Sequence, residues 1–166
     1  MSAALNYAGQ DGAAATEILT FRLGSNAFAM EVRHVREVLD YKPIAPVAGA
    51  PSNLIGMIDV RGTGVPVVDL KRKLGMHGLD MGPTPDTRII VLEFLIAMRP
   101  HTVAIVADAV HEVSDVADQK IEQPPQFGES WKADYMQGLG RRGEEFMTLL
   151  DIGALFADRD GAVFEF

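Results

Sequence analysis

Residues 138–143 (GLGRRG) have a glycine spacing that is found in nucleotide-binding loops. The pattern G-x-G-x-x-G binds the pyrophosphate of a dinucleotide when it follows a strand and opens a helix. Here Glu144 and Glu145 follow the last glycine, and a strand-like run (FMTLLD) comes next. Because adjacent carboxylates repel phosphate, the segment is predicted to be the turn of a β-hairpin and not a nucleotide site.

Three aspartates have a second chemically suggestive arrangement. Asp69, Asp108 and Asp151 each end an apolar run, and carboxylates can serve acid–base catalysis or bind a metal ion. A segment that suits a short helical turn follows each of them. An aspartate in front of a helix accepts hydrogen bonds from the first backbone N–H groups. We therefore interpret all three as helix caps.

The remaining residue types form no catalytic constellation. No histidine lies three or four residues from another, so no two can share a helix face as metal ligands; the four are His34, His77, His101 and His111. The chain has no cysteine and no serine in a G-x-S-x-G motif. The sequence therefore predicts a protein that is not an enzyme and that needs no metal or cofactor.

Arg61 is the residue with the clearest potential for binding. It lies in Asp59-Val60-Arg61-Gly62, at the tip of a strand that is otherwise apolar, and Gly62 suits a turn with positive φ. One alternative is a structural arginine that pairs with Asp59 or Glu37. The other is an arginine that pairs with a carboxylate on a partner protein.

The charge of the chain narrows the class of partner. Its 166 residues include 15 Lys and Arg against 23 Asp and Glu, a net charge of −8. Nucleic acids and anionic membrane surfaces are repelled by this charge, so neither is expected as a partner. No stretch approaches 18 apolar residues, and the first basic residue, Arg22, comes too late for a secretory signal. We expect a soluble cytoplasmic protein that binds other proteins.

Most of the elements that must position these residues are short strands, because apolar residues recur with a period of two. The runs on either side of Gly24-Ser25-Asn26 predict a β-hairpin. Val35, Val38 and Leu39 follow at helical spacing and predict one or two helical turns, and three prolines make residues 41–53 an extended loop. Further strand-like runs lie at residues 54–60, 65–70, 88–95 and 102–107, and a last pair brackets Arg141-Arg142-Gly143.

An internal repeat organises these strands. Gly56 to Asp69 and Gly138 to Asp151 each span 13 positions with matching polarity, and the motif VREV that begins at Val35 returns 75 residues later as VHEV. A unit of roughly 70–80 residues with about five strands suits a small barrel, since closure removes exposed sheet edges. The sequence thus predicts an all-β fold of two small barrels that share a core or a groove.

Four longer strings resemble the CheW-like domain family of bacterial chemotaxis coupling proteins. They are FRLGSNAFAMEVRHVREV, PVAGAPSNLIGMIDVRGTGVPVVDL, VAIVADAVHEV and MQGLGRRGEEFMTLLDI, and the match covers residues 17–157. The resemblance implies two tandem five-stranded SH3-like barrels with short helical turns. The implied division is a flexible tail at 1–16, a CheW-like domain at 17–158 with barrels at about 17–85 and 86–158, and a C-terminal tail at 159–166.

The resemblance also implies a function. Family members are non-catalytic scaffolds that couple the cytoplasmic tips of methyl-accepting chemoreceptors to the regulatory domain of a CheA-type histidine kinase, in arrays at the membrane. The receptor occupies the groove between the barrels, where the matching positions are Val35, Glu37, Val38, Gly56, Arg61, Val110 and Val113. We expect Val35 and Val38 to be partly exposed, because the equivalent Val110 and Val113 recur and both barrels can offer the same face. The kinase surface maps more loosely to Ile44 and Val47.

Two alternatives and three departures from the family pattern accompany this interpretation. The chain could be a CheW paralogue that serves another chemosensory pathway, or a small-ligand-binding enzyme built on tandem barrels. It has Asp59 where the family often has asparagine, and Met98-Arg99-Pro100-His101 where the family favours a glycine-containing turn. The family also usually has glycine at the position of Ala104.

Overall fold

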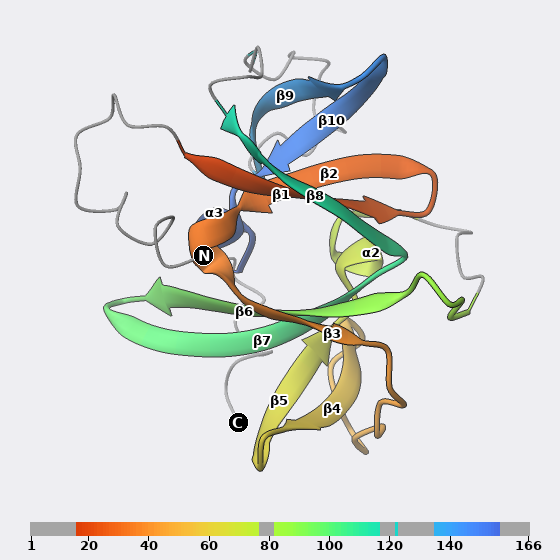
Figure 1. Ribbon diagram of the computed structural model, residues 1–166. Coiled ribbons are helices and arrows are strands. Elements are labelled where there is room, and N and C mark those ends of the chain that lie inside the picture. The colour runs from red at the N-terminus through yellow and green to blue at the C-terminus, as the bar shows by residue number, and fades with distance from the viewer. Residues whose placement is uncertain (1–15, 77–81, 117–121, 123–134, 157–166) are drawn as a thin grey trace.

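The computed structural model describes residues 16–76, 82–116, 122 and 135–156. Within these ranges ten strands form two five-stranded sheets, as the all-β prediction requires (Figure 1). Sheet A has the order β8 (Ala109–Asp115), β1 (Glu17–Leu23), β2 (Asn26–Glu31), β10 (Glu145–Leu150) and β9 (Met136–Arg142). Sheet B has the order β3 (Val35–Asp40), β6 (Arg88–Ile96), β7 (Arg99–Ala107), β5 (Thr63–Val68) and β4 (Leu54–Val60).

The predicted hairpins are present. β1 pairs with β2 around Gly24, whose φ of 60° is reached at no steric cost by glycine. β4 and β5 turn through Arg61 and Gly62, which have φ of 53° and 85°, as in a type I′ turn. The segment GLGRRG ends β9 and turns into β10, so its prediction as a hairpin is confirmed.

The predicted helical turn at residues 35–39 is wrong. A single 3-10 turn, η2 (Val32–His34), ends before it, and the segment is strand β3, paired with β6 from Val35–Leu92 to Asp40–Arg88. Burial alternates along β3 with a period of two. A β-bulge between Val35 and Glu37 shifts the register, so Val35 and Val38 pair with Leu92 and Ile90 of the largest apolar cluster, whereas Leu39 packs against the cluster of sheet B. The three-residue spacing of the valines therefore comes from the bulge and not from a helix.

The expected division into barrels at residue 85 is also wrong. Each sheet combines a hairpin from one repeat with three strands from the other: β1–β2 with β8, β9 and β10, and β6–β7 with β3, β4 and β5. Short connections enforce this exchange. Only Asp108 separates β7 from β8. To pair with the free side of β6 in the β6–β7 hairpin, β8 would have to lie two strand spacings, roughly 10 Å, from β7. The two Cα steps of 3.8 Å across Asp108 are too short for this.

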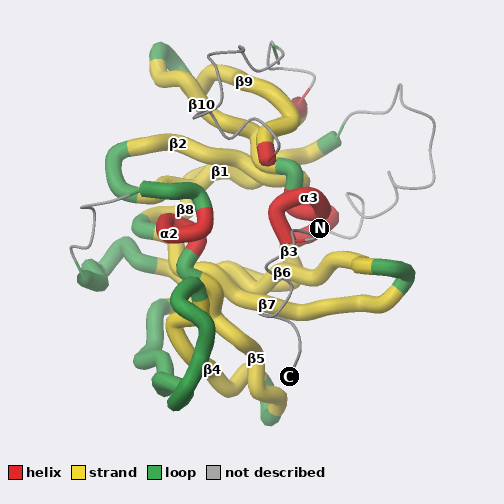
Figure 2. The backbone as a smooth tube through the Cα atoms, turned by 180° about the vertical axis from the view of Figure 1, so that it is seen from behind, coloured by secondary structure: helices red, strands yellow, loops and turns green. Residues whose placement is uncertain are grey.

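The largest apolar cluster lies between the two sheets. It takes Phe21 and Met30 from sheet A and Ile90 and Ile105 from sheet B. Two short helices, α2 (Leu70–Lys73) and α3 (Ile152–Phe156), contribute further buried side chains to it. Figure 2 shows both helices in the space between the sheets. Each sheet also has a smaller apolar cluster of its own, formed by side chains of its own strands.

Candidate functional site

The two repeated valine motifs lie at equivalent places on the two sheets. Val38 on β3 and Val113 on β8 are 40% and 43% exposed. Val35 and Val110 are half-buried and pack against the same inter-sheet cluster. The predicted partial exposure of Val35 and Val38 is therefore confirmed, and the equivalent Val110 and Val113 are partly exposed as well. We call these four residues the inter-sheet surface.

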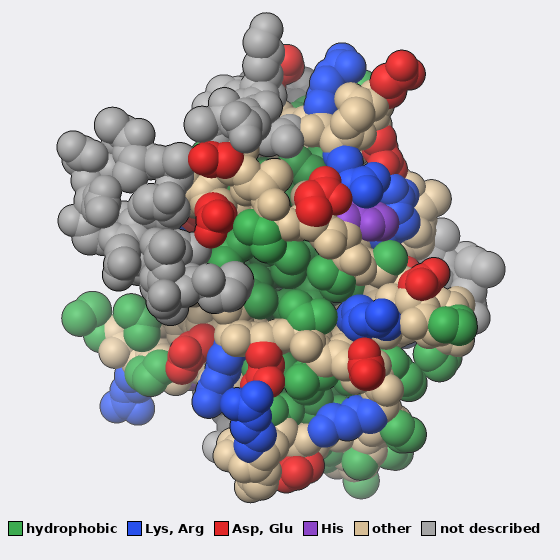
Figure 3. Space-filling view, viewed as in Figure 1, with side chains coloured by type: hydrophobic (Ala, Val, Ile, Leu, Met, Phe, Trp, Pro, Cys, Tyr) green, Lys and Arg blue, Asp and Glu red, His purple; other side chains and the backbone are tan. Residues whose placement is uncertain are grey.

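Hydrophobic side chains gather on this face of the molecule. Figure 3 shows them over the space between β8 and β3, bordered above and below by charged side chains. β3 and β8 are the outer strands of their sheets, so their free edges and outward side chains are accessible. An apolar strip with charged margins suits a helix that presents an apolar face.

Arg61 pairs with Glu37 across the two outer strands of sheet B. The Arg61 Nη2 lies 2.9 Å from Glu37 Oε1. The Glu37 side chain is only 16% exposed, whereas that of Arg61 is 79% exposed. The carboxylate of the other candidate, Asp59, instead accepts a hydrogen bond from the Gly62 backbone N–H. Arg61 thus holds an internal partner and still presents most of its side chain to solvent.

Sheet A has an ion pair of the same kind, which sequence reasoning missed. Arg142 Nε lies 3.2 Å from Glu112 Oε2. Glu112 is 75 residues after Glu37. Arg61 lies in the turn between β4 and β5, and Arg142 is the last residue of β9 before its turn into β10. Because β3 and β4, like β8 and β9, are the two outer strands of one sheet, each ion pair bridges the open edges of a barrel-like sheet. The 75-residue offset could have identified Glu112, but the 82-residue offset of the second segment leads from Arg61 to Gly143, one residue after Arg142.

Gly56 belongs to a different part of the structure from the valines. It is buried, and a Cβ at this position would lie 2.2 Å from the backbone oxygen of Ala45. The loop crosses β4 there, because Ala45 and Met57 exchange two backbone hydrogen bonds of 2.9 and 2.8 Å. Gly56 therefore offers no side chain to a partner. Its lack of a Cβ allows the loop at Ala45 to pack against β4. Glu122 and Leu139 make the equivalent bridge on sheet A.

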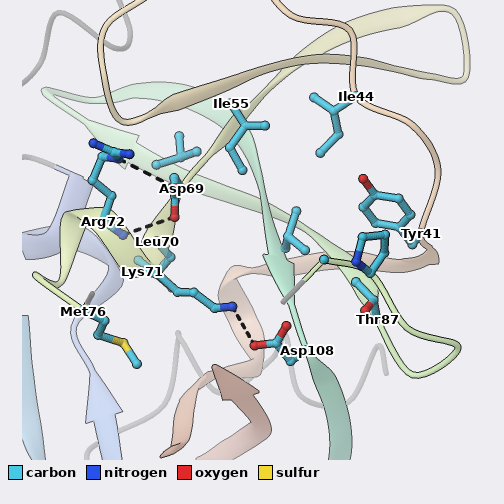
Figure 4. A pocket seen from close by; sticks show the side chains of 14 residues that line it. Tyr41, Ile44, Ile55, Asp69, Leu70, Lys71, Arg72, Met76, Thr87 and Asp108 are labelled. Atoms are coloured by element: carbon cyan, nitrogen blue, oxygen red, sulfur yellow. Dashed lines mark hydrogen bonds and ion pairs between the residues drawn. The ribbon is translucent and has the colours of Figure 1, made fainter. Parts of the chain in front are cut away.

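Ile44, one of the two expected kinase-binding residues, lines a pocket of about 370 Å³ beside α2. Figure 4 shows Ile44 and Ile55 on one wall. Val47, 39% exposed, follows Ile44 in the same loop. On the opposite wall Lys71 Nζ lies 2.9 Å from Asp108 Oδ2. This neutralised charge beside an aliphatic wall suits an apolar side chain of a partner.

The three aspartates divide into two roles. Asp69 accepts a hydrogen bond from the Arg72 N–H at the start of α2, and Asp151 accepts one from the Ala154 N–H at the start of α3. Their prediction as caps is confirmed. Asp108 precedes strand β8, so the capping prediction is wrong there; its carboxylate accepts a hydrogen bond from the Gly24 N–H. Within the described ranges, no three side chains of the metal-ligating types cluster.

Three titratable groups at two sites outside these surfaces have perturbed pKa values. Arg22 forms a two-bond ion pair with Glu145, at 2.7 and 2.9 Å, which lowers the pKa of Glu145 and raises that of Arg22. Burial of His34 lowers its pKa, and the neighbouring Arg33 adds to the effect. Both sites therefore couple the stability of the fold to pH.

Comparison with known proteins establishes the family. A model of the CheW-like domain matches residues 17–160. The chain belongs to the CheW-like domain family. A chemotaxis protein CheW from Klebsiella aerogenes is 30% identical over 147 residues, 89% of this chain and 85% of that protein. Protein FrzA from Myxococcus xanthus is 28% identical over 141 residues, 84% of each chain.

A solved structure supports the same conclusion. The scaffolding protein CheW from Thermoanaerobacter tengcongensis superposes with a TM-score of 0.73 at 27% identity, over 88% of this chain and 90% of that one. The CheW-like fold of two five-stranded sheets is thus shared. Among the described residues, no helix is long and apolar enough to cross a membrane.

Proposed function

We propose that this CheW-like protein is a non-catalytic scaffold that couples the cytoplasmic tips of chemoreceptors to a CheA-type histidine kinase. The observation that carries the proposal is the inter-sheet surface, in which equivalent strands of two sheets present one exposed and one half-buried valine each. Receptor tips are helical hairpins, and a helix with an apolar face fits such a strip.

Charge at the margin sets the orientation of the receptor in this proposal. Arg61 is 79% exposed although it pairs with Glu37, so it can reach a second carboxylate on a bound helix. A charged group at an interface margin contributes to orientation and association rate more than to affinity. The receptor surface therefore comprises the four valines with Glu37 and Arg61, and excludes the buried Gly56.

The kinase surface in this proposal is the loop that carries Ile44 and Val47, together with the pocket beside it. It involves the β4 edge of sheet B, whereas the valines lie on β3 and β8. Separate surfaces let one molecule bind receptor and kinase at once. Modest individual contacts then gain from the effective concentration within a membrane-associated array of cytoplasmic components, and a receptor signal acts by shifting the population of kinase states.

Binding of the purified protein to two purified probes tests the proposal. The probes are the cytoplasmic hairpin of a chemoreceptor and the regulatory domain of a CheA-type kinase, both from the genome that encodes this chain. Val38→Glu and Val113→Glu should each weaken receptor binding and leave kinase binding intact, while Val47→Glu should do the reverse. Absence of receptor and kinase binding by the unaltered protein would contradict the proposal.

A second candidate is a paralogue that serves another chemosensory pathway. One relative carries the name FrzA and not CheW, which supports this second candidate. Purification of the protein with its bound partners from its native host distinguishes the two, because the kinase that accompanies it identifies the pathway. A thermal-shift screen with nucleotides, divalent metals and phosphate esters tests the third alternative, a small-ligand-binding enzyme.

A further inference from the structure

The β6–β7 hairpin is longer than its counterpart in the other sheet. Ala29 on β2 and Ala104 on β7 are equivalent, because each faces the parallel strand of its sheet. From that alanine toward the turn, β1–β2 has three further cross-strand pairs and β6–β7 has five. The extra pairs are Leu95–Pro100 and Ile96–Arg99. We call residues 95–100 the hairpin tip.

The hairpin tip exposes apolar side chains. Met98 is 88% exposed and Leu95 is 63% exposed, and Pro100 is also exposed. In Figure 3 hydrophobic side chains stand out from the body at the lower left, where Figure 1 places the end of β6 and β7. Soluble proteins seldom leave such groups together on a projecting element unless they bind something.

The turn of the hairpin tip keeps side chains where glycine would be less strained. Ala97 and Met98 have φ of 52° and 67°, in the left-handed region that residues with a Cβ adopt at a cost. The turns of the other three hairpins in the described ranges each include a glycine with positive φ: Gly24, Gly62 and Gly143. The turn between β6 and β7 is thus strained and carries an exposed methionine where glycine would relieve the strain. Such strain is typical of functional sites, which indicates a binding role for the Met98 side chain.

The hairpin tip is continuous with the inter-sheet surface. β3 begins at Val35, opposite Leu92, and β6 runs four residues further, which is about 13 Å at the rise of a strand. Ile96 packs against the same inter-sheet cluster as Val35 and Val110. A helix that lies along the inter-sheet surface and extends by about nine residues spans this distance.

Arg99 defines the charge of the partner at this end. It is exposed, it lies within the hairpin tip, and the described residues provide it with no ion pair. The tip itself carries no carboxylate. Arg99 pairs with Ile96 and so shares its face, which is turned to the inter-sheet cluster. A helix with an apolar face and an acidic residue opposite Arg99 would contact the exposed Met98 side chain of the turn and neutralise the unpaired charge.

We infer that the hairpin tip is an additional docking contact for the helical receptor hairpin that occupies the inter-sheet surface, and that it recognises an apolar face flanked by an acidic residue. This inference rests on the proposed function. It makes the hairpin tip a determinant of which receptors this protein accepts, because only a helix with that pattern one to three turns beyond the valines engages it.

Calorimetric titration of the full chain with the purified chemoreceptor hairpin tests the inference. Met98→Ser should weaken binding about tenfold, since an apolar side chain is lost from the interface. Leu95→Ser should weaken it less, because Leu95 lies on the opposite face of β6 from Ile96, which packs against the inter-sheet cluster. Arg99→Glu should also weaken binding. Its affinity for the receptor hairpin should fall as the salt concentration is reduced, whereas the affinity of the unaltered protein should rise. The matched control is Phe146→Ser: Phe146 is 62% exposed on β10 of sheet A, and its loss should change the receptor Kd by less than twofold.

The outcomes separate this inference from the function on which it rests. If the unaltered protein does not bind the receptor hairpin, the proposed function fails. If it binds, and Val38→Glu abolishes binding while the hairpin-tip variants bind like the unaltered protein, only the inference is overturned. It is equally overturned if the hairpin-tip variants lose kinase binding or self-association and keep receptor binding. Unfolding curves of all variants should coincide, because the changed side chains are exposed.

Discussion

Replacement of Arg61 by glutamate tests whether its charge serves the fold or a partner. The guanidinium lies 2.9 Å from Glu37 Oε1, with side-chain exposures of 79% for the arginine and 16% for the glutamate. Reversal of the charge puts two carboxylates near each other at the open edges of sheet B. The same change presents a negative charge to any acidic residue on a bound receptor.

The size of the two effects differs. Two unit charges 4 Å apart interact by about 1 kcal/mol in water and about 4 kcal/mol at an effective dielectric constant of 20. The exposure of Arg61 places the pair near the lower value, and exposed pairs typically contribute about 0.2–1 kcal/mol. We expect Arg61→Ala to lower the free energy of unfolding by about 0.5 kcal/mol and Arg61→Glu by about 1–2 kcal/mol. Receptor binding should weaken by about 2 kcal/mol, or roughly 30-fold, with kinase binding unchanged.

Urea unfolding and receptor titration of matched variants measure both effects. Arg142→Glu is the control, because Arg142 pairs with Glu112 in the equivalent place on sheet A. It should lower stability by a similar amount and leave receptor affinity within about threefold. The exchanged variant Arg61→Glu with Glu37→Arg should recover stability, since the ion pair is restored with opposite polarity, but not receptor affinity.

Three results would refute this reasoning. The first is recovery of receptor affinity in the exchanged variant together with stability, since the pair would then act only by closing the sheet. The second is an equal loss of receptor and kinase binding on Arg61→Glu, which would indicate a global change in the fold. Unfolding of the protein by Arg61→Glu would lead to the same conclusion.

Three further predictions concern stability. Gly56→Ala should lower the free energy of unfolding by about 2–4 kcal/mol, because its Cβ would meet the loop backbone at 2.2 Å, whereas Gly64→Ala, which meets only a methionine methyl at 3.3 Å, should cost less than about 1 kcal/mol; equal costs in urea unfolding would contradict the contact. The lowered pKa of His34 means that the unfolded chain binds a proton more readily, so stability should fall as pH drops from about 7 through the ordinary value of 6.5 and below. His34→Gln should flatten this slope, and an unchanged slope would assign it to other groups. Ala97→Gly should raise the unfolding free energy by about 0.5–1 kcal/mol by relieving a positive φ, and a lower melting temperature would show that the turn is not strained.

The sequence predicts the hairpins and the repeat because both follow from local pattern. Alternation of apolar residues and a glycine in the turn are sufficient for β1–β2 and β4–β5. Capping by Asp69 and Asp151 is predictable for the same reason, since the helix that follows each one is adjacent in the chain. Asp108 has the same local pattern, yet its partners Gly24 and Lys71 come from distant segments, so its role was not accessible to pattern reasoning.

Exchange of strands between the sheets could not be predicted from the repeat. A repeat indicates which segments are alike, and it does not indicate whether each unit pairs with itself or with the other. The one-residue link at Asp108 decides this, and its effect depends on distances in three dimensions. Gly56 illustrates the same limit on the site: its motif position was found, but its buried location under Ala45 depends on a loop that returns to β4.

The exchange of strands has a consequence for cooperativity. A polypeptide that ends between β5 and β6 contains the first hairpin of sheet A and three strands of sheet B, so it completes neither sheet. Each half therefore has unpaired strand edges when it is alone, and the whole chain should unfold in a single transition rather than barrel by barrel. If the two halves are produced as separate polypeptides, each supplies the strands the other lacks. Their association would reconstitute the protein as a split pair, with binding of the receptor hairpin as the reporter that both sheets have closed.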